Sequence, residues 1–256
     1  MGARIRGVLA VVAAGSTLLT ACESKPREPT AITVYATSTM IHSMTVIGKK
    51  FEEDNPGTSV EFIFAGSTDL ASELAAGAGA DVFVSGAVEQ MTSVVDAGLI
   101  QGAPEPFATS RLVIVTPPGN PLHLVSFADL AAPGVRVSLC AAQMTCATLT
   151  RTIEGKTGVR LQPVSEEVTS EDVVRKVVTG KADAGVVFAS EAITAGAHVS
   201  WVDFPEAAAA KSVCEIGLLK STDEAELSKK FIREVTDETS RPVLAESGFG
   251  EPPGQK

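Results

Sequence analysis

Short apolar runs of strand length alternate with segments of helix length along most of the chain. The run Ile32–Ala36 comes first, and apolar residues then recur at the spacing of one helix face. The residues expected on that face are Met40, Ile41, Met44, Ile47 and Phe51. Further strands at 60–65 and 81–84, each followed by a helical segment, complete a β-α-β-α-β order. This order predicts a parallel sheet covered by helices.

The second half of the chain continues the alternation. Further strands are expected at 111–115, 135–139, 184–188 and 213–219, and helices after Cys146, near Thr169 and around 224–245. We therefore predict an α/β protein of two lobes, each with a mostly parallel sheet flanked by helices, and a cleft between them. The first lobe is expected at 31–109 plus 206–256 and the second at 110–205, with linkers near 108–110 and 204–211.

The N-terminus has the pattern of an export signal. Arg4 and Arg6 precede an apolar run that ends at Leu19, which is shorter than the roughly 20 residues needed to span a bilayer. Residues 1–21 are therefore predicted to be a removable signal peptide. The segment before Cys22 resembles a bacterial lipobox, which implies a lipidated Cys22, a tether over 22–30, and an extracytoplasmic protein held at the cell membrane by its lipid anchor alone. An ordinary signal peptide with a chance cysteine is the alternative.

The net charge and the positions of the cysteines narrow the range of possible functions. After residues 1–21, 19 basic residues face 31 acidic ones, a net charge of −12, which argues against nucleic acid and against a polybasic membrane contact. In an oxidising compartment, Cys140 and Cys146 are close enough in sequence to pair as a disulfide. Cys214 lies in an apolar run and is expected to be a buried strand residue.

Four places share one pattern, in which small or hydroxyl-bearing residues precede or open a helix. They lie at 36–39, 65–68, 145–148 and 169–173. The first N–H groups of a helix lack partners within the helix and carry partial positive charge, so several helix starts in one cleft form an anion site without Lys or Arg. Ordinary N-capping is the alternative, and Thr169 with Asp172 has the pattern of a capping box.

The chain resembles the molybdate-binding proteins of ABC importers over nearly all of its length after the signal. The resemblance is carried by Ile32–Ala36 with Thr39-Met40, Phe62–Ala71, Gly79–Ser85, Glu171–Val173, Ala182–Phe188 and Ser247–Phe249. It implies a two-lobed periplasmic-binding-protein fold of type II and high-affinity capture of molybdate or tungstate between the lobes. It also implies a monomer that delivers the oxyanion to an ABC transporter permease with its ATPase, without a cofactor and without direct metal ligands.

The resemblance also implies the binding residues. Thr39 falls on the first hydroxyl position, with Ser38 beside it, and Ser67 on the second. The two backbone-amide positions fall on Cys146 and Val173. The family's tyrosine position falls on Phe188, which lacks the hydroxyl donor, so the preference for molybdate over other tetrahedral oxyanions is less firmly implied.

Other functions remain open from the sequence. Sulfate is the main rival ligand. A secreted enzyme is a less favoured alternative, because catalytic motifs are absent and His42, His123 and His198 lie far apart. An iron binder would need more tyrosines than Tyr35, and an amino-acid binder would need charged partners such as Arg111 and Asp81.

Overall fold

The computed structural model describes residues 30–254, so the predicted signal peptide, Cys22 and the tether up to residue 29 lie outside the described residues. The strands are β1 Thr30–Thr37, β2 Thr58–Ala65, β3 Val82–Ser85, β4 Glu105–Thr116, β5 Val137–Cys140, β6 Ser165–Glu167, β7 Ala184–Phe188, β8 Ser200–Val202 and β9 Lys211–Leu218. The α-helices are α1 Ile41–Asp54, α2 Ser67–Ala75, α3 Val88–Asp96, α4 Thr145–Thr157, α5 Ser170–Val178, α6 Ala189–Ala195, α7 Ala225–Thr236 and α8 Arg241–Glu246. The 3-10 helices are η1 Ser38–Met40, η2 Ala128–Ala131, η3 Gly196–His198, η4 Pro205–Ala209 and η5 Glu238–Ser240.

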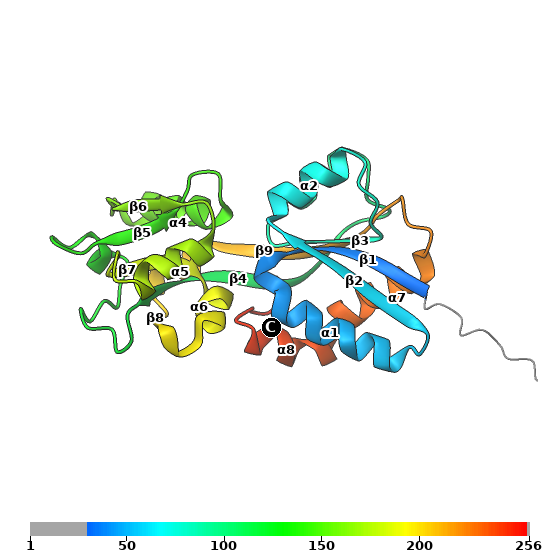
Figure 1. The fold of residues 1–256 in the computed structure, drawn as a ribbon. Helices are drawn as coiled ribbons and strands as arrows, with labels where there is room; N and C mark the ends of the chain where they lie inside the picture. Colours follow the sequence, from blue (N-terminus) through cyan, green and yellow to red (C-terminus); the bar gives the residue numbers. More distant parts are fainter. Residues whose placement is uncertain (1–29, 255–256) are drawn as a thin grey trace, which may run out of the picture.

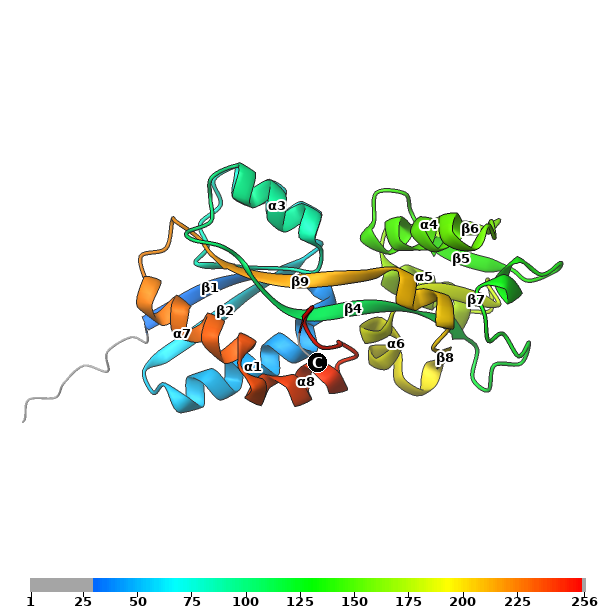
Figure 2. The same ribbon diagram turned by 180° about the vertical axis from the view of Figure 1, so that it is seen from behind.

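The strands follow the order β2-β1-β3-β9-β4-β7-β5-β6, and β8 pairs with β4. The predicted parallel pairing is present on both sides, where β1 lies between β2 and β3, and β5 between β6 and β7. In the middle, β4 and β9 run antiparallel to their neighbours and to each other. They extend from one half of the molecule to the other (Figure 2).

The crossing at 108–110 is therefore made by paired strands. β4 pairs with β9 from Glu105 to Arg111 and then with β7 from Leu112 to Val115. This change of partner occurs within one continuous strand, so the backbone hydrogen-bonding groups remain satisfied where the chain passes between lobes.

Three buried clusters define the two lobes. Two of them belong to the first lobe, where α2 and α3 cover one face of the sheet and α1, α7 and α8 the other (Figures 1 and 2). The third, from Leu112 to Ala210, is the core of the second lobe. Phe204 stacks on Phe127 with ring centroids 5.9 Å apart, and Ala207 and Ala210 are buried in the same cluster. The segment 206–210, assigned to the first lobe from sequence, thus packs with the second.

Two local expectations are wrong. The predicted helix over 224–245 is broken into α7 and α8 by η5, because Asp237 accepts from the Thr239 N–H and Pro242 opens a new helix at its first turn. Met40, Met44, Ile47 and Phe51 are buried as expected, but Ile41 is 50 % exposed. Ile41 is the first residue of α1 and directly follows η1, which ends at Met40.

Candidate functional site

The first-lobe wall of the site forms where β1 and β3 end and α2 begins. Ser67, the first residue of α2, accepts a hydrogen bond at its Oγ from the Gly86 N–H, 3.1 Å away. A Cβ on Gly86 would lie 3.3 Å from Thr37 Cγ2 and 3.7 Å from Ser67 Oγ. Thr37 and Ser67 therefore lie on either side of a glycine that leaves little room for a side chain.

Two predicted hydroxyl residues belong to this wall. The Oγ1 atoms of Thr37 and Thr39 are 3.4 Å apart, and Thr37 is buried while Thr39 is half-buried. Ser38 is exposed on the same turn, η1. The structure thus places Thr39 and Ser67 beside the same group of residues, around Thr37 and Gly86.

The start of α2 has donors available. Its N-cap is Gly66, and no side chain caps it within the described chain, so the first N–H groups of α2 stay open to another acceptor. Because Ser67 Oγ already accepts from Gly86, its own proton is free to be donated. The N-capping alternative does not hold here, since Ser67 lies inside the helix.

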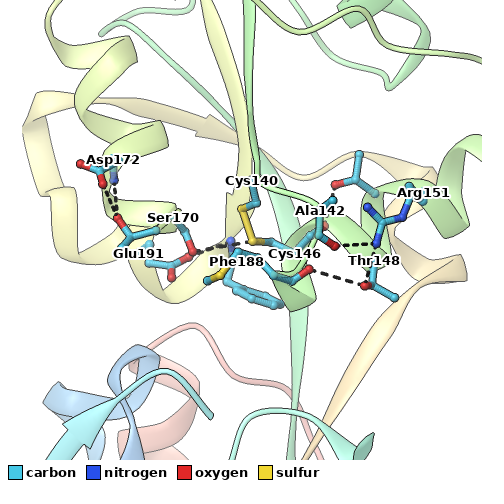
Figure 3. The surroundings of a disulfide bond; sticks show 12 residues. Cys140, Ala142, Cys146, Thr148, Arg151, Ser170, Asp172, Phe188 and Glu191 are labelled. Atoms are coloured by element: carbon cyan, nitrogen blue, oxygen red, sulfur yellow. Dashed lines mark hydrogen bonds between the residues drawn. A yellow bond between two sulfur atoms is a disulfide. The ribbon is translucent and has the colours of Figure 1, made fainter. Parts of the chain in front are cut away.

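The second-lobe wall contains the predicted disulfide. Cys140 ends β5 and Cys146 lies at the second position of α4, and their sulfurs are bonded at 2.02 Å (Figure 3). The bond closes the loop over 141–145 directly at the helix start. The N-cap Met144 cannot cap with a side-chain oxygen, so the Cys146 N–H is one of the open donors of α4.

The start of α5 is different, because it caps itself. Thr169 Oγ1 accepts from the Asp172 N–H at 3.1 Å, so Thr169 is the N-cap of α5. The Asp172 carboxylate accepts from the Thr169 hydroxyl at 2.8 Å, so the observed bonds form the first half of the expected capping box. The Val173 N–H donates to the Thr169 carbonyl over a long 3.4 Å, so this predicted amide is already engaged, although weakly. The Val173 side chain is fully buried and packs over Gly185, where a Cβ would lie 2.5 Å from Val173 Cγ1. The amides of Ser170 and Glu171 precede it on the same turn.

Phe188 ends β7 next to these helix starts, and the residue is buried, with 6 % of its surface exposed. Its N–H donates to Glu191 Oε2 at 2.9 Å. Ser170, the first residue of α5, lies with its Oγ 3.9 Å from Cys146 Sγ. Cys146, Phe188 and the α5 start are thus brought together, as Figure 3 shows.

Glu191 is a residue that the sequence did not reveal as part of this wall. It is only partly exposed as a residue, and dense packing around its carboxyl desolvates the charged form and raises its pKa to about 7. Hydrogen bonds from the Ser170 hydroxyl and the Phe188 N–H oppose this rise, and the nearby charge of Glu171 adds to it. Its only sequence signal was a carboxylate three residues after a strand end, the position of a helix-capping Glu.

The two walls belong to different lobes and face each other. The first-lobe turn η1 is in contact with α6, and first-lobe segments run directly beneath the labelled residues in Figure 3. A cavity of about 170 Å³ lies between the lobes, lined by the first turn of α3, the loop and start of α4, and the start of β9. Its polar lining residues are Glu89, Gln90, Gln143, Thr145, Thr148, Lys211 and Ser212.

The charged residues considered for an amino-acid ligand have structural partners instead. Arg111 pairs with Asp203 at 2.9 Å and donates to the Gly248 carbonyl at 3.1 Å. Asp81 accepts from the Thr33 N–H and the Thr222 hydroxyl. Within residues 30–254, no group of three or more His, Cys, Asp or Glu side chains could hold a metal ion.

A two-lobed α/β fold with facing helix starts and hydroxyl groups defines a class of ligand-binding proteins, and comparison with known proteins agrees. The model of the bacterial extracellular solute-binding protein family matches residues 32–250, and this chain belongs to that family. Its members bind solutes and are not enzymes. No helix over residues 30–254 combines the length and apolar character needed to cross a membrane.

Three individual proteins that this chain resembles bind oxyanions, according to their names. Molybdate-binding protein ModA of Mycobacterium tuberculosis is 45% identical over 233 residues, which cover 90% of this chain and 89% of that protein. The periplasmic molybdate-binding protein of Azotobacter vinelandii has a TM-score of 0.73 at 19% identity, covering 86% of this chain and 99% of that one. The sulfate-binding protein SubI of M. tuberculosis has a TM-score of 0.72 at 20% identity, covering 86% of each chain. These solved structures share the type II periplasmic-binding fold with this chain.

Proposed function

We propose that this chain captures a tetrahedral oxyanion with high affinity outside the cytoplasm, namely molybdate or tungstate, and delivers it to an ABC transporter permease with its ATPase. The 45% identity to a molybdate-binding protein supports the ligand. The observation that carries the proposal is that helix starts without a side-chain cap lie on both facing walls, α2 in the first lobe and α4 in the second, with hydroxyl groups beside the first. In this proposal the protein acts as a monomer, tethered through a lipidated Cys22.

Neutral donors suffice to hold the dianion. The proposed first-lobe donors are the hydroxyls of Thr39, with Ser38 beside it, and Ser67, together with the N–H groups at the α2 start. The second lobe adds the N–H groups near Cys146 and Val173. Five to seven charge-assisted hydrogen bonds give a gross gain of about 8–20 kcal/mol, and micromolar to nanomolar affinity needs about 8–12 kcal/mol.

The same donors explain how binding is expected to bring the lobes together. An anion attracted to both walls stabilises the arrangement in which both contact it, and so shifts the population toward closure. A site of donors also selects among anions. Phosphate near neutral pH carries a proton that needs an acceptor, whereas molybdate, tungstate and sulfate are unprotonated dianions. Cavity size then has to separate these three.

The ligand is tested by calorimetric titration of the chain lacking residues 1–22 with molybdate, tungstate, sulfate and phosphate. The described helices and strands all lie beyond that cut. We expect sub-micromolar binding of molybdate and tungstate and no binding of phosphate. Sub-micromolar sulfate binding without heat from molybdate would overturn the assignment.

Ser67→Ala tests the first-lobe wall. Loss of one hydrogen bond to a charged group is expected to weaken molybdate binding about 10- to 100-fold, measured by the same titration. The matched control is Ser72→Ala on the same helix, whose hydroxyl donates to the Thr68 carbonyl within α2 and should not affect binding. An unchanged affinity in Ser67→Ala would remove Ser67 from the site.

A further inference from the structure

Glu191 connects three segments of the second-lobe wall. Its carboxyl accepts from the Phe188 N–H at 2.9 Å, at the end of β7, and from the Ser170 hydroxyl, at the start of α5. Ser170 in turn lies 3.9 Å from the sulfur of Cys146 at the start of α4. One carboxyl group therefore joins the end of β7 to the start of α5, and Ser170 continues the contact to the start of α4 (Figure 3).

This carboxyl has no cation beside it among the described residues. The charge that acts on it is that of Glu171, on the first turn of α5. The other ionisable groups on the elements packed against α6 lie in ion pairs, except for Glu105 at the exposed start of β4 and His198 on η3, and β7 and η1 contain none. They are Asp172 paired with Arg175, Lys176 paired with Glu167, Arg111 paired with Asp203, and Glu105 and His198.

We propose that Glu191 is a positioning residue of the oxyanion site that holds Phe188 and Ser170 in place, and that its carboxylate form opposes the bound dianion. The inference rests on the proposed function. It assigns to the same site a group that couples ligand affinity to pH: the neutral carboxyl is compatible with a dianion on the wall in front of it, whereas a carboxylate repels it.

The direction of the coupling follows from linkage. The pKa of Glu191 is about 7 without ligand, and a dianion nearby raises it further by favouring the neutral form. By reciprocity, a protonated Glu191 favours the ligand to the same extent. Affinity is therefore highest below pH 7 and falls above it. If the bound dianion raises the pKa by about 1 to 1.5 units, affinity falls about tenfold between pH 6.5 and pH 8.5.

The experiment measures molybdate affinity of the native chain lacking residues 1–22 and of Glu191→Gln at half-unit steps over this pH range. Molybdate stays a dianion throughout, so its own protonation does not contribute. Glutamine keeps an oxygen to accept from the Phe188 N–H and cannot ionise. We expect the native affinity to fall about tenfold, and the Glu191→Gln affinity to stay constant within about twofold and to exceed the native value at pH 8.5.

Proton uptake gives a readout that a purely structural role would not change. Titrations at pH 7.5 in two buffers of different ionisation enthalpy should show about half a proton taken up per molybdate by the native protein. Glu191→Gln should take up none. Glu191→Ala, which removes the hydrogen-bonded brace as well as the charge, should bind more weakly than Glu191→Gln at every pH.

Two further variants test whether another ionisable group causes the pH dependence of binding. His42→Gln removes the histidine on the first turn of α1 and should retain the native pH profile. Glu171→Gln removes the neighbouring charge that raises the pKa of Glu191, so affinity should still fall with pH, but over a lower pH range. A flat native profile, or a slope that persists in Glu191→Gln, would overturn the proposal while leaving oxyanion binding intact. Failure of the native protein to bind molybdate, tungstate or sulfate would overturn the proposed function as well.

Discussion

Phe188 shows how one side chain affects the chemistry of the second-lobe wall. Its ring is buried at the end of β7, and it contributes an apolar surface where the resemblance expects a phenol donor. A missing donor next to a dianion lowers the available binding energy, because a hydrogen bond to a charged group contributes about 1.5–3 kcal/mol. The remaining donors must then come from backbone N–H groups and from the first-lobe hydroxyls.

Restoring the phenol tests this interpretation. Phe188→Tyr is expected to tighten molybdate binding about tenfold, because it adds one charge-assisted hydrogen bond, and calorimetry at pH 6.5 measures the change. Phe188→Leu retains an apolar side chain and should not tighten binding. If the tyrosine variant binds no better than the native protein, the far edge of the ring does not face the ligand.

The pKa of Glu191 also predicts how the stability of the ligand-free protein depends on pH. Its pKa is raised from 4.5 to about 7 in the folded protein, so its contribution to stability is fully present below pH 4.5 and is lost as the pH rises through 7. Relative to Glu191→Gln, the native free energy of unfolding should fall by about 3 kcal/mol over this interval. Urea unfolding at pH 4.5 and pH 7.5 measures it. A constant difference between the two proteins would contradict the raised pKa.

Among the secondary-structure elements, the positions of most strands and helices were predictable from the pattern of apolar residues. Apolar runs and helix periodicity located β1, α1, β2 and β7, because burial of one face is encoded in consecutive residues. The antiparallel placement of β9 between β3 and β4 was not predictable in the same way. The partner residues in β3 and β4 lie at least 100 positions earlier in the chain, from Val82 opposite Leu218 to Arg111 opposite Lys211, and an apolar strand sequence does not specify its direction.

In the candidate site, too, features encoded in consecutive residues were predictable, and contacts between distant segments were not. The strand–helix junctions that contain Thr39 and Ser67 are visible in sequence, and the family resemblance implied these two hydroxyls as binding positions. The packing of Gly86 between Thr37 and Ser67, and the hydrogen bonds of Glu191 to Phe188 and Ser170, depend on how separate segments meet in space. The Cys140–Cys146 disulfide is an intermediate case, because its partners are six residues apart and the sequence already brings them together.

That disulfide supports the start of α4. Replacing both Cys140 and Cys146 by alanine is expected to lower the free energy of unfolding by about 2 kcal/mol, since a small closed loop restricts the unfolded chain. It should also weaken molybdate binding, because the Cys146 N–H lies at the end of the loop that the bond closes. Urea unfolding and calorimetry measure the two effects. Cys214→Ala is the control for binding, since Cys214 is buried in β9 away from the loop. An unchanged affinity in the double variant would show that α4 is held without the bond.

On the scale of the whole molecule, the two lobes are joined by more than the β4–β9 ribbon. The C-terminal segment pairs with the middle of β4, where the N–H groups of Thr109 and Gly250 each donate to the other's carbonyl at 2.9 and 2.8 Å. Gly248 packs against the start of α6, so closely that a Cβ would lie 2.9 Å from the Ser190 nitrogen. The first lobe therefore contacts the second beside the crossing strands, and motion between lobes has to preserve this contact or break it.

The overall charge determines how a dianion reaches the site. The chain has a formal net charge of −10, but beyond a Debye length of about 8–10 Å this charge is largely screened. Local charges at the interlobe cavity therefore matter more. Lys211 lines that cavity at the start of β9, and over residues 30–254 it has no carboxylate partner within 4.0 Å. It is placed to attract an approaching anion.

Lys211→Gln should therefore slow association more than it affects dissociation. In stopped-flow measurements with molybdate at low ionic strength we expect an association rate about threefold lower, with the dissociation rate unchanged, and a difference that disappears in high salt. Lys49→Gln changes the net charge equally but removes an exposed lysine paired with Glu53 on α1, so it should not alter either rate. A change confined to the dissociation rate would mean that Lys211 contacts the bound oxyanion. The site would then contain a cation besides its neutral N–H and hydroxyl donors.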